Sequence, residues 1–236
     1  MGRQRQIRRM SSGTCRFCSG TFSKRAMAGH LESCAQRAMP SDRAPGEPGS
    51  PRTRSLYLLV EGRHNPEYWL HLEVLADATL KTVDAFLRKT WLECCGHMSV
   101  FTVQGARYGM AADRALGHRS MQIRLGELLR PGTTFSHEYD FGTTTELVLK
   151  VIAEHEGRGT RNTIHLLARN EPPSMACGSC GKPATELCTE CLCKGKGGGL
   201  CDVCVREHPC DGEMRLPVAN SPRVGMCGYT GEGDAL

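Results

Sequence analysis

The pattern of cysteines near the end of the chain constrains the fold more than any other feature of the sequence. Nine of the fourteen cysteines lie between Cys177 and Cys227. Most of them belong to three Cys-x2-Cys pairs and one His-x-Cys pair, which are Cys177 and Cys180, Cys188 and Cys191, Cys201 and Cys204, and His208 and Cys210. Two sulfurs three residues apart can both reach one tetrahedral ion, each at about 2.3 Å. A segment this rich in loops buries too little apolar surface to fold alone, so we expect bound zinc to fold it.

These eight ligands are enough for two four-ligand sites, and alternating pairs usually cross-brace. We therefore expect one zinc on Cys177, Cys180, Cys201 and Cys204, and a second on Cys188, Cys191, His208 and Cys210. Cys193 is an additional candidate ligand for the second site. The segment resembles the B-box and MYND class of cross-braced modules, although Cys210 stands where a second His is common. The resemblance implies that this module binds a partner protein.

A further set of ligand residues lies near the N-terminus, with the spacing Cys15-x2-Cys18-x11-His30-x3-Cys34. His30 and Cys34 are four residues apart, so on a helix they share one face and can meet the same ion. Phe22 and Met27 lie between the two ligand pairs and are expected to form the small core of a ββα finger. The sequence thus predicts three zinc ions in all.

Positive charge is concentrated at the N-terminus, although the whole chain has a net charge of only +5. Residues 1–40 contain eight Lys or Arg residues against one acid, whereas residues 172–236 contain six basic and eight acidic residues. Only the N-terminal module therefore looks suited to a polyanion. The candidate nucleic-acid contacts are Arg3, Arg5, Arg8, Arg9, Lys24 and Arg25. The alternative is a structural finger whose basic face is solvated or contacts protein.

Regular secondary structure is expected in the middle of the chain. Apolar or alternating runs predict strands at 56–60, 68–74, 99–104, 134–141, 146–153 and 163–168. Helical spacing predicts one long helix from Asp77 or Thr79 to Glu93. This order is typical of an α+β fold with a β-grasp-like sheet packed on one helix. The expected parts are a basic arm (1–13), a Cys-Cys-His-Cys finger (14–38), a Pro- and Gly-rich linker (39–54), the α+β domain (55–170) and the second zinc module with a tail (171–236).

Several stretches of the middle domain carry a family resemblance. They are Tyr-Trp-Leu-His-Leu-Glu-Val at 68–74, Ala-Thr-Leu at 78–80, Phe101 near Arg-Tyr-Gly at 107–109, and the strongest piece, Arg-Leu-Gly-Glu-Leu-Leu at 124–129 followed by Phe-Ser-His-Glu-Tyr-Asp-Phe-Gly at 135–142. On these residues the domain resembles the plasmid-encoded Orf-three-like domain, also labelled an insertion-element passenger domain. That family usually continues after the last motif with an acidic residue, a small residue and Trp, whereas Thr143 to Glu146 follow here. The resemblance implies association with mobile elements in genomes, and it does not imply recombinase chemistry.

Catalysis is not expected. His137 would face away from Glu138 and Asp140 on a strand, and the two acids would share a solvated face. The sequence contains no phosphate-binding glycine loop, nucleophile elbow or open catalytic zinc motif, so no small-molecule substrate is predicted. An enzymatic alternative would depend on Glu138 or Asp140.

Four other ligand-type residues are not expected to bind metal. Cys227 is expected to be a free thiol, and Cys94 and Cys95 to be half-buried, because adjacent cysteines rarely ligate one zinc. His97 has no ligand spacing, like His64, His71 and His118.

The N-terminus lacks the apolar core of a secretory signal, and no apolar run approaches the roughly 18 residues of a membrane span. We therefore expect a cytoplasmic protein without membrane contact, whose thiols stay reduced. The expected function is that of a non-catalytic adaptor that binds nucleic acid through the finger and a partner protein through the second zinc module. The alternative is a pure protein-interaction subunit of a larger complex.

Overall fold

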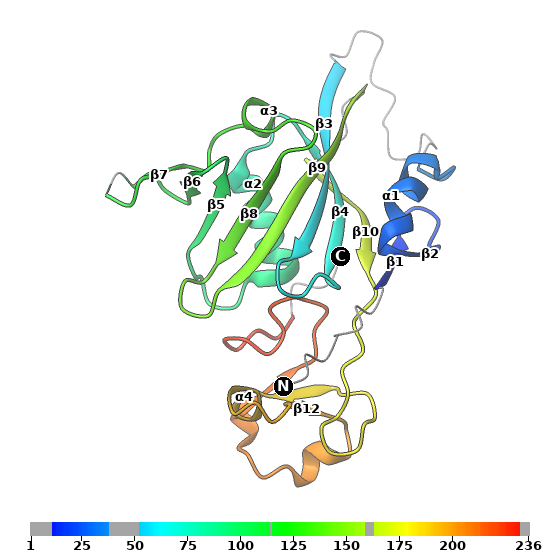
Figure 1. The fold of residues 1–236 in the computed structure, drawn as a ribbon, viewed down its shortest axis with the longest axis vertical. Helices are drawn as coiled ribbons and strands as arrows, with labels where there is room; N and C mark the ends of the chain where they lie inside the picture. The colour runs from blue at the N-terminus through cyan, green and yellow to red at the C-terminus, as the bar shows by residue number, and fades with distance from the viewer. Residues whose placement is uncertain (1–10, 38–51, 114, 159–162, 232–236) are drawn as a thin grey trace, which may run out of the picture.

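The structure, a computed structural model, describes residues 11–37, 52–113, 115–158 and 163–231. Arg3, Arg5, Arg8 and Arg9 and most of the predicted linker lie outside these ranges. The described residues form a mixed α and β fold with one large sheet and few helices (Figure 1). The strands of the large sheet are β1 (Ser12–Cys15), β2 (Thr21–Ser23), β3 (Arg52–Gly62), β4 (Trp69–Leu75), β5 (Ser99–Val103), β6 (Ala106–Gly109), β7 (His118–Ser120), β8 (Thr134–Tyr139), β9 (Thr145–Arg158) and β10 (Ile164–Asn170).

The order of strands across the sheet is β2-β1-β10-β4-β3-β9-β8-β5-β6-β7. Neighbouring strands are antiparallel except for β6 and β7, which are parallel. The long strands β3 and β9 form the centre, and their pairing runs from Gly62 opposite Leu147 to Arg52 opposite Arg158. The strand predicted at 56–60 is therefore longer than expected and starts inside the predicted linker, because β9 supplies hydrogen-bond partners along its whole length.

One face of the sheet is covered by α2 (Leu80–Leu87), which continues as a π-helical turn, η2 (Arg88–Leu92). The side chain of Thr79 caps this helix by accepting from the N–H of Thr82 at 3.3 Å. Alternate side chains of β3 point toward the helix, so that Leu56 and Leu58 pack in one core with Val83 and Trp91. Together α2 and η2 span the helix predicted between Thr79 and Glu93. A short helix, α3 (Leu125–Leu128), lies between β7 and β8.

The opposite face carries a second core, which is built with the N-terminal module. Here α1 (Lys24–Ser33) places Met27 and Leu31 against Tyr57, Trp69 and Leu167 of the sheet, and all five side chains are buried. The module is joined to the sheet as well, because β1 pairs antiparallel with β10. Residues predicted as a separate finger and as the end of a basic arm thus form an edge of the large sheet.

Gly13 shows how closely β1 approaches the sheet. A Cβ atom at this position would overlap the carbonyl oxygen of Arg169 and the ring of Trp69. Any larger residue would force β1 away from β10, so the pairing needs glycine here. The indole of Trp69 in turn donates to the hydroxyl of Ser11 at 2.9 Å.

The C-terminal module is a small unit below the large sheet in Figure 1. Its three strands have the order β12-β11-β13. Its elements are β11 (Glu186–Cys188), α4 (Thr189–Cys193), β12 (Gly199–Leu200), the 3-10 turns η3 (Cys204–Glu207) and η4 (Gly212–Met214), and β13 (Arg215–Pro217).

After β13 the chain returns to the central domain. We call residues 218–231 the tail segment. The side chain of Asn220 donates to the carbonyl oxygen of Asn170 at 2.9 Å and accepts from the amide of Asn170 at 2.7 Å. The hydroxyl of Ser221 donates to the carbonyl oxygen of Trp91 at 2.6 Å, and Val224 packs against the first core. The tail segment therefore connects the two bodies of the molecule through specific polar and apolar contacts. Among the described residues, no helix is long and apolar enough to cross a membrane.

Candidate metal centres

Cys and His side chains gather into four groups in the described part of the chain. Within each group the ligand atoms all lie within 4.8 Å of one another. The groups are Cys15, Cys18, His30 and Cys34; Cys177, Cys180, Cys201 and Cys204; Cys188, Cys191, His208 and Cys210; and Cys94, Cys95, His97 and Cys227. The first three contain the twelve ligands proposed from spacing, divided in the proposed way. The fourth was not expected, so the number of groups is four rather than three.

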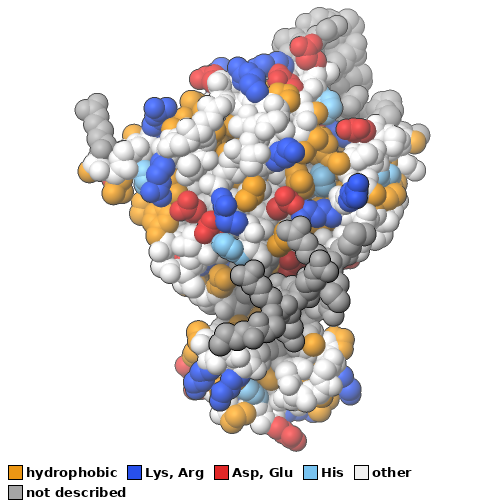
Figure 2. All heavy atoms as spheres, in the orientation of Figure 1, with side chains coloured by type: hydrophobic (Ala, Val, Ile, Leu, Met, Phe, Trp, Pro, Cys, Tyr) orange, Lys and Arg blue, Asp and Glu red, His pale blue; other side chains and the backbone are white. Residues whose placement is uncertain are grey.

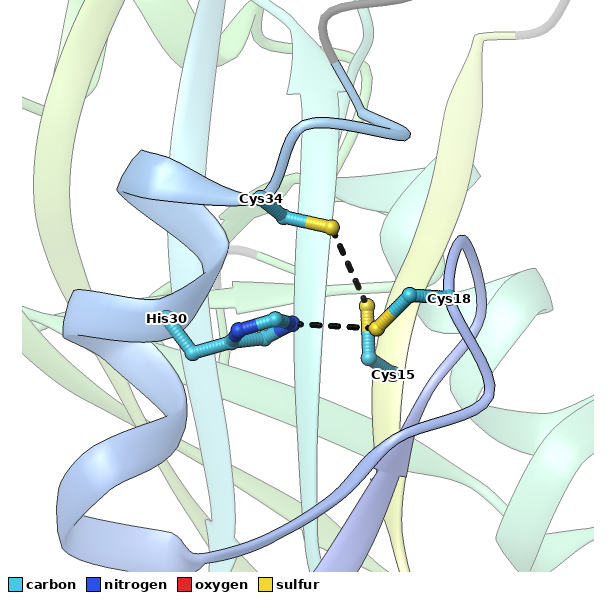
Figure 3. A group of neighbouring side chains, drawn as sticks. All are labelled: Cys15, Cys18, His30 and Cys34. Atoms are coloured by element: carbon cyan, nitrogen blue, oxygen red, sulfur yellow. Dashed lines mark hydrogen bonds between the residues drawn. The ribbon is translucent and has the colours of Figure 1, made fainter.

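The N-terminal group draws its ligands from a strand, a turn and a helix (Figure 3). Cys15 ends β1, Cys18 lies in the turn before β2, and His30 and Cys34 lie on and just after α1. His30 Nε2 is 3.3 Å from Cys18 Sγ, and Cys34 Sγ is 4.0 Å from Cys15 Sγ. The side chains point toward one another, so one ion can reach all four.

Packing beside the first group holds its histidine in place. The ring of Phe22 stacks on the ring of His30, with centroids 3.7 Å apart. Met27, the other residue expected in the small core, is fully buried beneath α1. Ser23 caps the helix by accepting from the N–H of Ala26 at 3.3 Å. The orientation of the imidazole is therefore fixed by the fold of the module and does not depend on the ion alone.

The two groups of the C-terminal module have similar dimensions. Cys180 Sγ is 3.6 Å from Cys201 Sγ, and Cys191 Sγ is 3.5 Å from His208 Nε2 and 3.8 Å from Cys210 Sγ. A tetrahedral zinc with Zn–S bonds of about 2.3 Å separates two sulfurs by about 3.8 Å. The spacing of the ligand atoms thus fits a zinc ion in both groups. Cys193 is exposed and belongs to neither.

Backbone N–H groups point at the sulfur that begins each Cys-x2-Cys pair in this module. The N–H groups of Cys201, Ser179 and Cys180 lower the pKa of the Cys177 thiol to about 6. At Cys188 burial opposes ionisation, but the N–H of Cys191 and the ring of His208 lower the pKa of the thiol to about 7. Because zinc binds the thiolate, donors already aimed at sulfur favour the ligand form before an ion arrives.

The fourth group brings together residues that were not expected to meet. Cys227 was expected to be a free thiol, the Cys94–Cys95 pair to be structural, and His97 to be an isolated histidine. In the structure His97 Nε2 lies 3.0 Å from Cys95 Sγ and 3.2 Å from Cys227 Sγ. The partners are 130 residues apart along the chain and meet only because the tail segment folds back. The sequence carried one sign of this group. Once the first three groups are filled, Cys94, Cys95 and Cys227 remain without a role, besides Cys193.

The acidic residues considered for catalysis are also placed differently from expectation. Asp140 follows β8 with a φ of 65°, which turns its carboxylate away from the direction of Glu138 and into a buried contact with Arg223 at 2.7 Å. The two acids therefore do not share a face, because the strand ends between them. His137 is fully buried, and its Nε2 lies 2.7 Å from a carboxylate oxygen of Asp84 on α2.

Two of the basic residues of the N-terminal module contact the rest of the protein. Lys24 forms an ion pair with Glu61 and donates to the carbonyl oxygen of Pro66 at 2.6 Å. Arg37 donates to the carbonyl oxygen of Leu31 at 2.9 Å and lies 3.6 Å from Glu73. Arg25 is exposed on the first turn of α1. On the face shown in Figure 2, basic and acidic side chains lie next to each other over the large sheet.

No family model matches this chain, and no curated protein matches it. A solved structure similar to it is the crystal structure of a protein of unknown function, MM3350, from Methanosarcina mazei Go1. The two chains are 13% identical, the TM-score is 0.44, and the likeness covers 50% of this chain and 69% of the other. A similarity at this level indicates neither a fold family nor a function for this chain. The fold and the sites define the class of the molecule as a mixed α/β protein with Cys/His clusters compatible with metal binding.

Proposed function

We propose that this protein is a zinc-binding, non-catalytic adaptor. In this proposal the N-terminal module associates with nucleic acid and the C-terminal module docks on a partner protein. The observation that carries the proposal is the gathering of twelve Cys and His side chains into three four-ligand groups. Four protein ligands leave no open position on a tetrahedral zinc for a substrate. Sites of this kind suit the stabilisation of binding surfaces.

The C-terminal module supports the zinc part of the proposal. Its strands are two or three residues long, and a short run of hydrogen bonds cannot hold such a unit alone. Two zinc ions would connect its loops at eight points and supply the missing folding energy. Cysteine and histidine together are the ligands that zinc prefers in structural sites.

Apolar side chains on the surface of the same module support a protein partner. Val203, Leu192 and Met214 are all exposed, and the hydroxyl of Thr189 donates to the carbonyl oxygen of Met214, which brings the start of α4 and the end of η4 together. Large exposed apolar side chains on a small unit are typical of an interaction surface.

The basic residues at the N-terminus support the nucleic-acid part. Arg25 is exposed on α1, and Arg3, Arg5, Arg8 and Arg9 precede β1 in the sequence. Arginines of this kind suit phosphate contacts without base selectivity. Lys24, also a candidate contact, is engaged with Glu61 and would have to exchange that partner for a phosphate.

A pure protein-interaction subunit is the second candidate function. The pairs Lys24–Glu61 and Arg37–Glu73 favour it, because they use charge of the N-terminal module to attach the module to the sheet. This candidate predicts a stoichiometric protein partner after purification and no retention on heparin at physiological salt.

Binding of a short oligonucleotide, measured at several salt concentrations, separates the two candidates. We expect alanine at Arg3, Arg5, Arg8 and Arg9 together to weaken binding to every sequence alike. The slope of log affinity against log salt should also fall, by about 0.9 for each lost phosphate contact. A matched control removes four exposed lysines elsewhere, Lys81, Lys89, Lys150 and Lys182. Equal affinity of the arginine variant and the parent would exclude the nucleic-acid role of the arm.

A further inference from the structure

We propose that Cys94, Cys95, His97 and Cys227 form a fourth zinc site, and that zinc bound there clamps the tail segment to the central domain. This inference goes beyond the proposed adaptor function, which uses only the other three groups. Cys94, Cys95 and His97 lie in the loop between η2 and β5, and Cys227 lies in the tail segment. The site thus connects the tail segment to the central domain, whereas each of the other groups lies within one module.

The dimensions of this group match those of the other three. Cys95 Sγ is 3.7 Å from Cys94 Sγ and 3.9 Å from Cys227 Sγ. Two ligand atoms on one tetrahedral zinc are separated by about 3.5 to 3.8 Å. These sulfurs are too far apart for a disulfide bond of about 2.05 Å. Three thiolates and one imidazole form a ligand set that zinc accepts as a closed site.

Backbone conformation on both sides presents the ligands. Gly96, between Cys95 and His97, has a φ of 79°, and its N–H donates to the carboxylate of Glu93 at 2.6 Å. This turn lets two adjacent cysteines and the nearby histidine face the same point, which an extended chain would not allow. On the other side, Cys227 itself has a φ of 48°. A left-handed conformation at a non-glycine residue is uncommon and is often found at a functional position.

Polar groups around the site complete it. Arg223 donates to the sulfur of Cys94 at 3.4 Å, and the hydroxyl of Tyr139 lies 3.9 Å from the same sulfur. Zinc with three thiolates has a net charge of −1, and the guanidinium of Arg223 beside Cys94 would counter it. Donors to the sulfurs orient ligands and tune the metal in known sites. Arg223 belongs to the tail segment, as does the ligand Cys227.

The clamp follows from where the ligands lie. Zinc binds all four ligands only when the tail segment is docked, so the ion and the docked segment stabilise each other. Cys95 and Cys227 are exposed, whereas each of the other groups has at least one buried cysteine. We therefore expect this zinc to exchange faster than the other three.

Two measurements test the proposal on the full-length protein after equilibration with a small excess of Zn²⁺. Native mass spectrometry should find one zinc fewer in Cys227→Ser and in His97→Gln than in the parent. Cys193→Ser, at an exposed cysteine outside all four groups, should keep the full number. Hydrogen exchange of the amides in the tail segment should be about tenfold faster or more in the two ligand variants, because local opening no longer requires loss of the ion.

The outcomes are distinct. The same zinc number in Cys227→Ser, His97→Gln and the parent would overturn the site. One zinc fewer with unchanged exchange in the tail segment would overturn the clamp. If the other three groups bound no zinc, the number of zinc ions per chain would fall equally in the parent and the variants. The difference of one zinc between parent and variants would remain, so failure of the proposed function can be told apart from failure of this site.

Discussion

Arg223 donates to the carboxylate of Asp140 across 2.7 Å, and both side chains are buried where the tail segment meets the end of β8. The same guanidinium donates to the carbonyl oxygen of Thr143 at 3.1 Å and to the hydroxyl of Thr145 at 3.0 Å. Burial opposes ionisation of Asp140, but the hydrogen bond from Arg223 lowers the pKa of this carboxyl group to about 2. A buried charge persists only with such partners. This contact is therefore the polar anchor of the tail segment.

Removal of one partner from this buried pair should be costly. We expect Arg223→Met to lower the free energy of unfolding by about 3 to 5 kcal/mol, because it removes the guanidinium that compensates the buried charge of Asp140. Urea denaturation at neutral pH measures the loss. The control is Arg206→Met, at an exposed position of η3, which should change stability by no more than about 0.5 kcal/mol. A loss below about 1 kcal/mol for Arg223→Met would contradict the assignment of an anchor.

The second core predicts how strongly the N-terminal module is attached to the sheet. Met27 is fully buried between α1 and the sheet, so Met27→Ala should cost about 2 to 5 kcal/mol of stability. Met98→Ala serves as the control, since Met98 is 55% exposed and the same change there should be nearly neutral. The comparison uses thermal or urea unfolding of both variants. Similar losses in the two would show that α1 does not pack on the sheet as described.

The buried histidine beneath this module predicts an acid sensitivity. Burial, with a smaller contribution from the charge of Lys24, lowers the pKa of His71 to about 4. At pH values between about 4 and the ordinary pKa of about 6.5, His71 binds a proton in the unfolded chain but not in the folded protein. Stability should therefore decrease as the pH falls through this window, by on the order of 3 kcal/mol when the window has been crossed.

A variant separates this contribution from acid release of metal. Tyr57 Oη lies 2.7 Å from His71 Nδ1, and His71→Gln keeps a partner for the tyrosine without a titrating group. The slope of unfolding free energy against pH should be smaller in this variant than in the parent. Equal slopes for His71→Gln and the parent would exclude His71 as the source.

Removal of zinc should affect the modules unequally. We expect a strong chelator to remove amide protection from residues 186–217, because the short strands there depend on the two ions. The amides of β3 and β9 should stay protected, since apolar side chains hold the large sheet together. Hydrogen exchange before and after chelation measures both regions. Cys180→Ser should reproduce the effect on the C-terminal module, and Ser179→Ala next to it should not. Full protection in the chelated protein would show that the module folds without metal.

The sequence predicted the parts of the molecule that local spacing controls. The strand at 56–60 was found because it is a short apolar run, and the helix after Thr79 because its apolar residues recur with helical spacing. The grouping of Cys15, Cys18, His30 and Cys34 followed from pairs only a few residues apart. In each case the residues that meet in space are near neighbours in the chain.

The remaining features depend on contacts between distant segments. Pairing of β1 with β10 makes the N-terminal module part of the sheet, and no pattern in residues 14–38 could reveal a partner so far along the chain. The contact between Cys227 and His97 arises from the return of the tail segment. The turn at Asp140 was hidden for another reason. Alternation predicts a strand but not its last residue, and Asp140 adopts its left-handed conformation to meet Arg223.

The position of β10 has a consequence for synthesis of the protein. This strand is the neighbour of β1, yet the ribosome makes it after nearly the whole central domain. Proteins generally begin to fold from their N-terminal part while they are being made. The N-terminal module emerges early, but the side chains of Met27 and Leu31 have no complete docking surface until Leu167 emerges. A newly made chain therefore passes through a period in which this apolar surface is open to chaperones or to other chains.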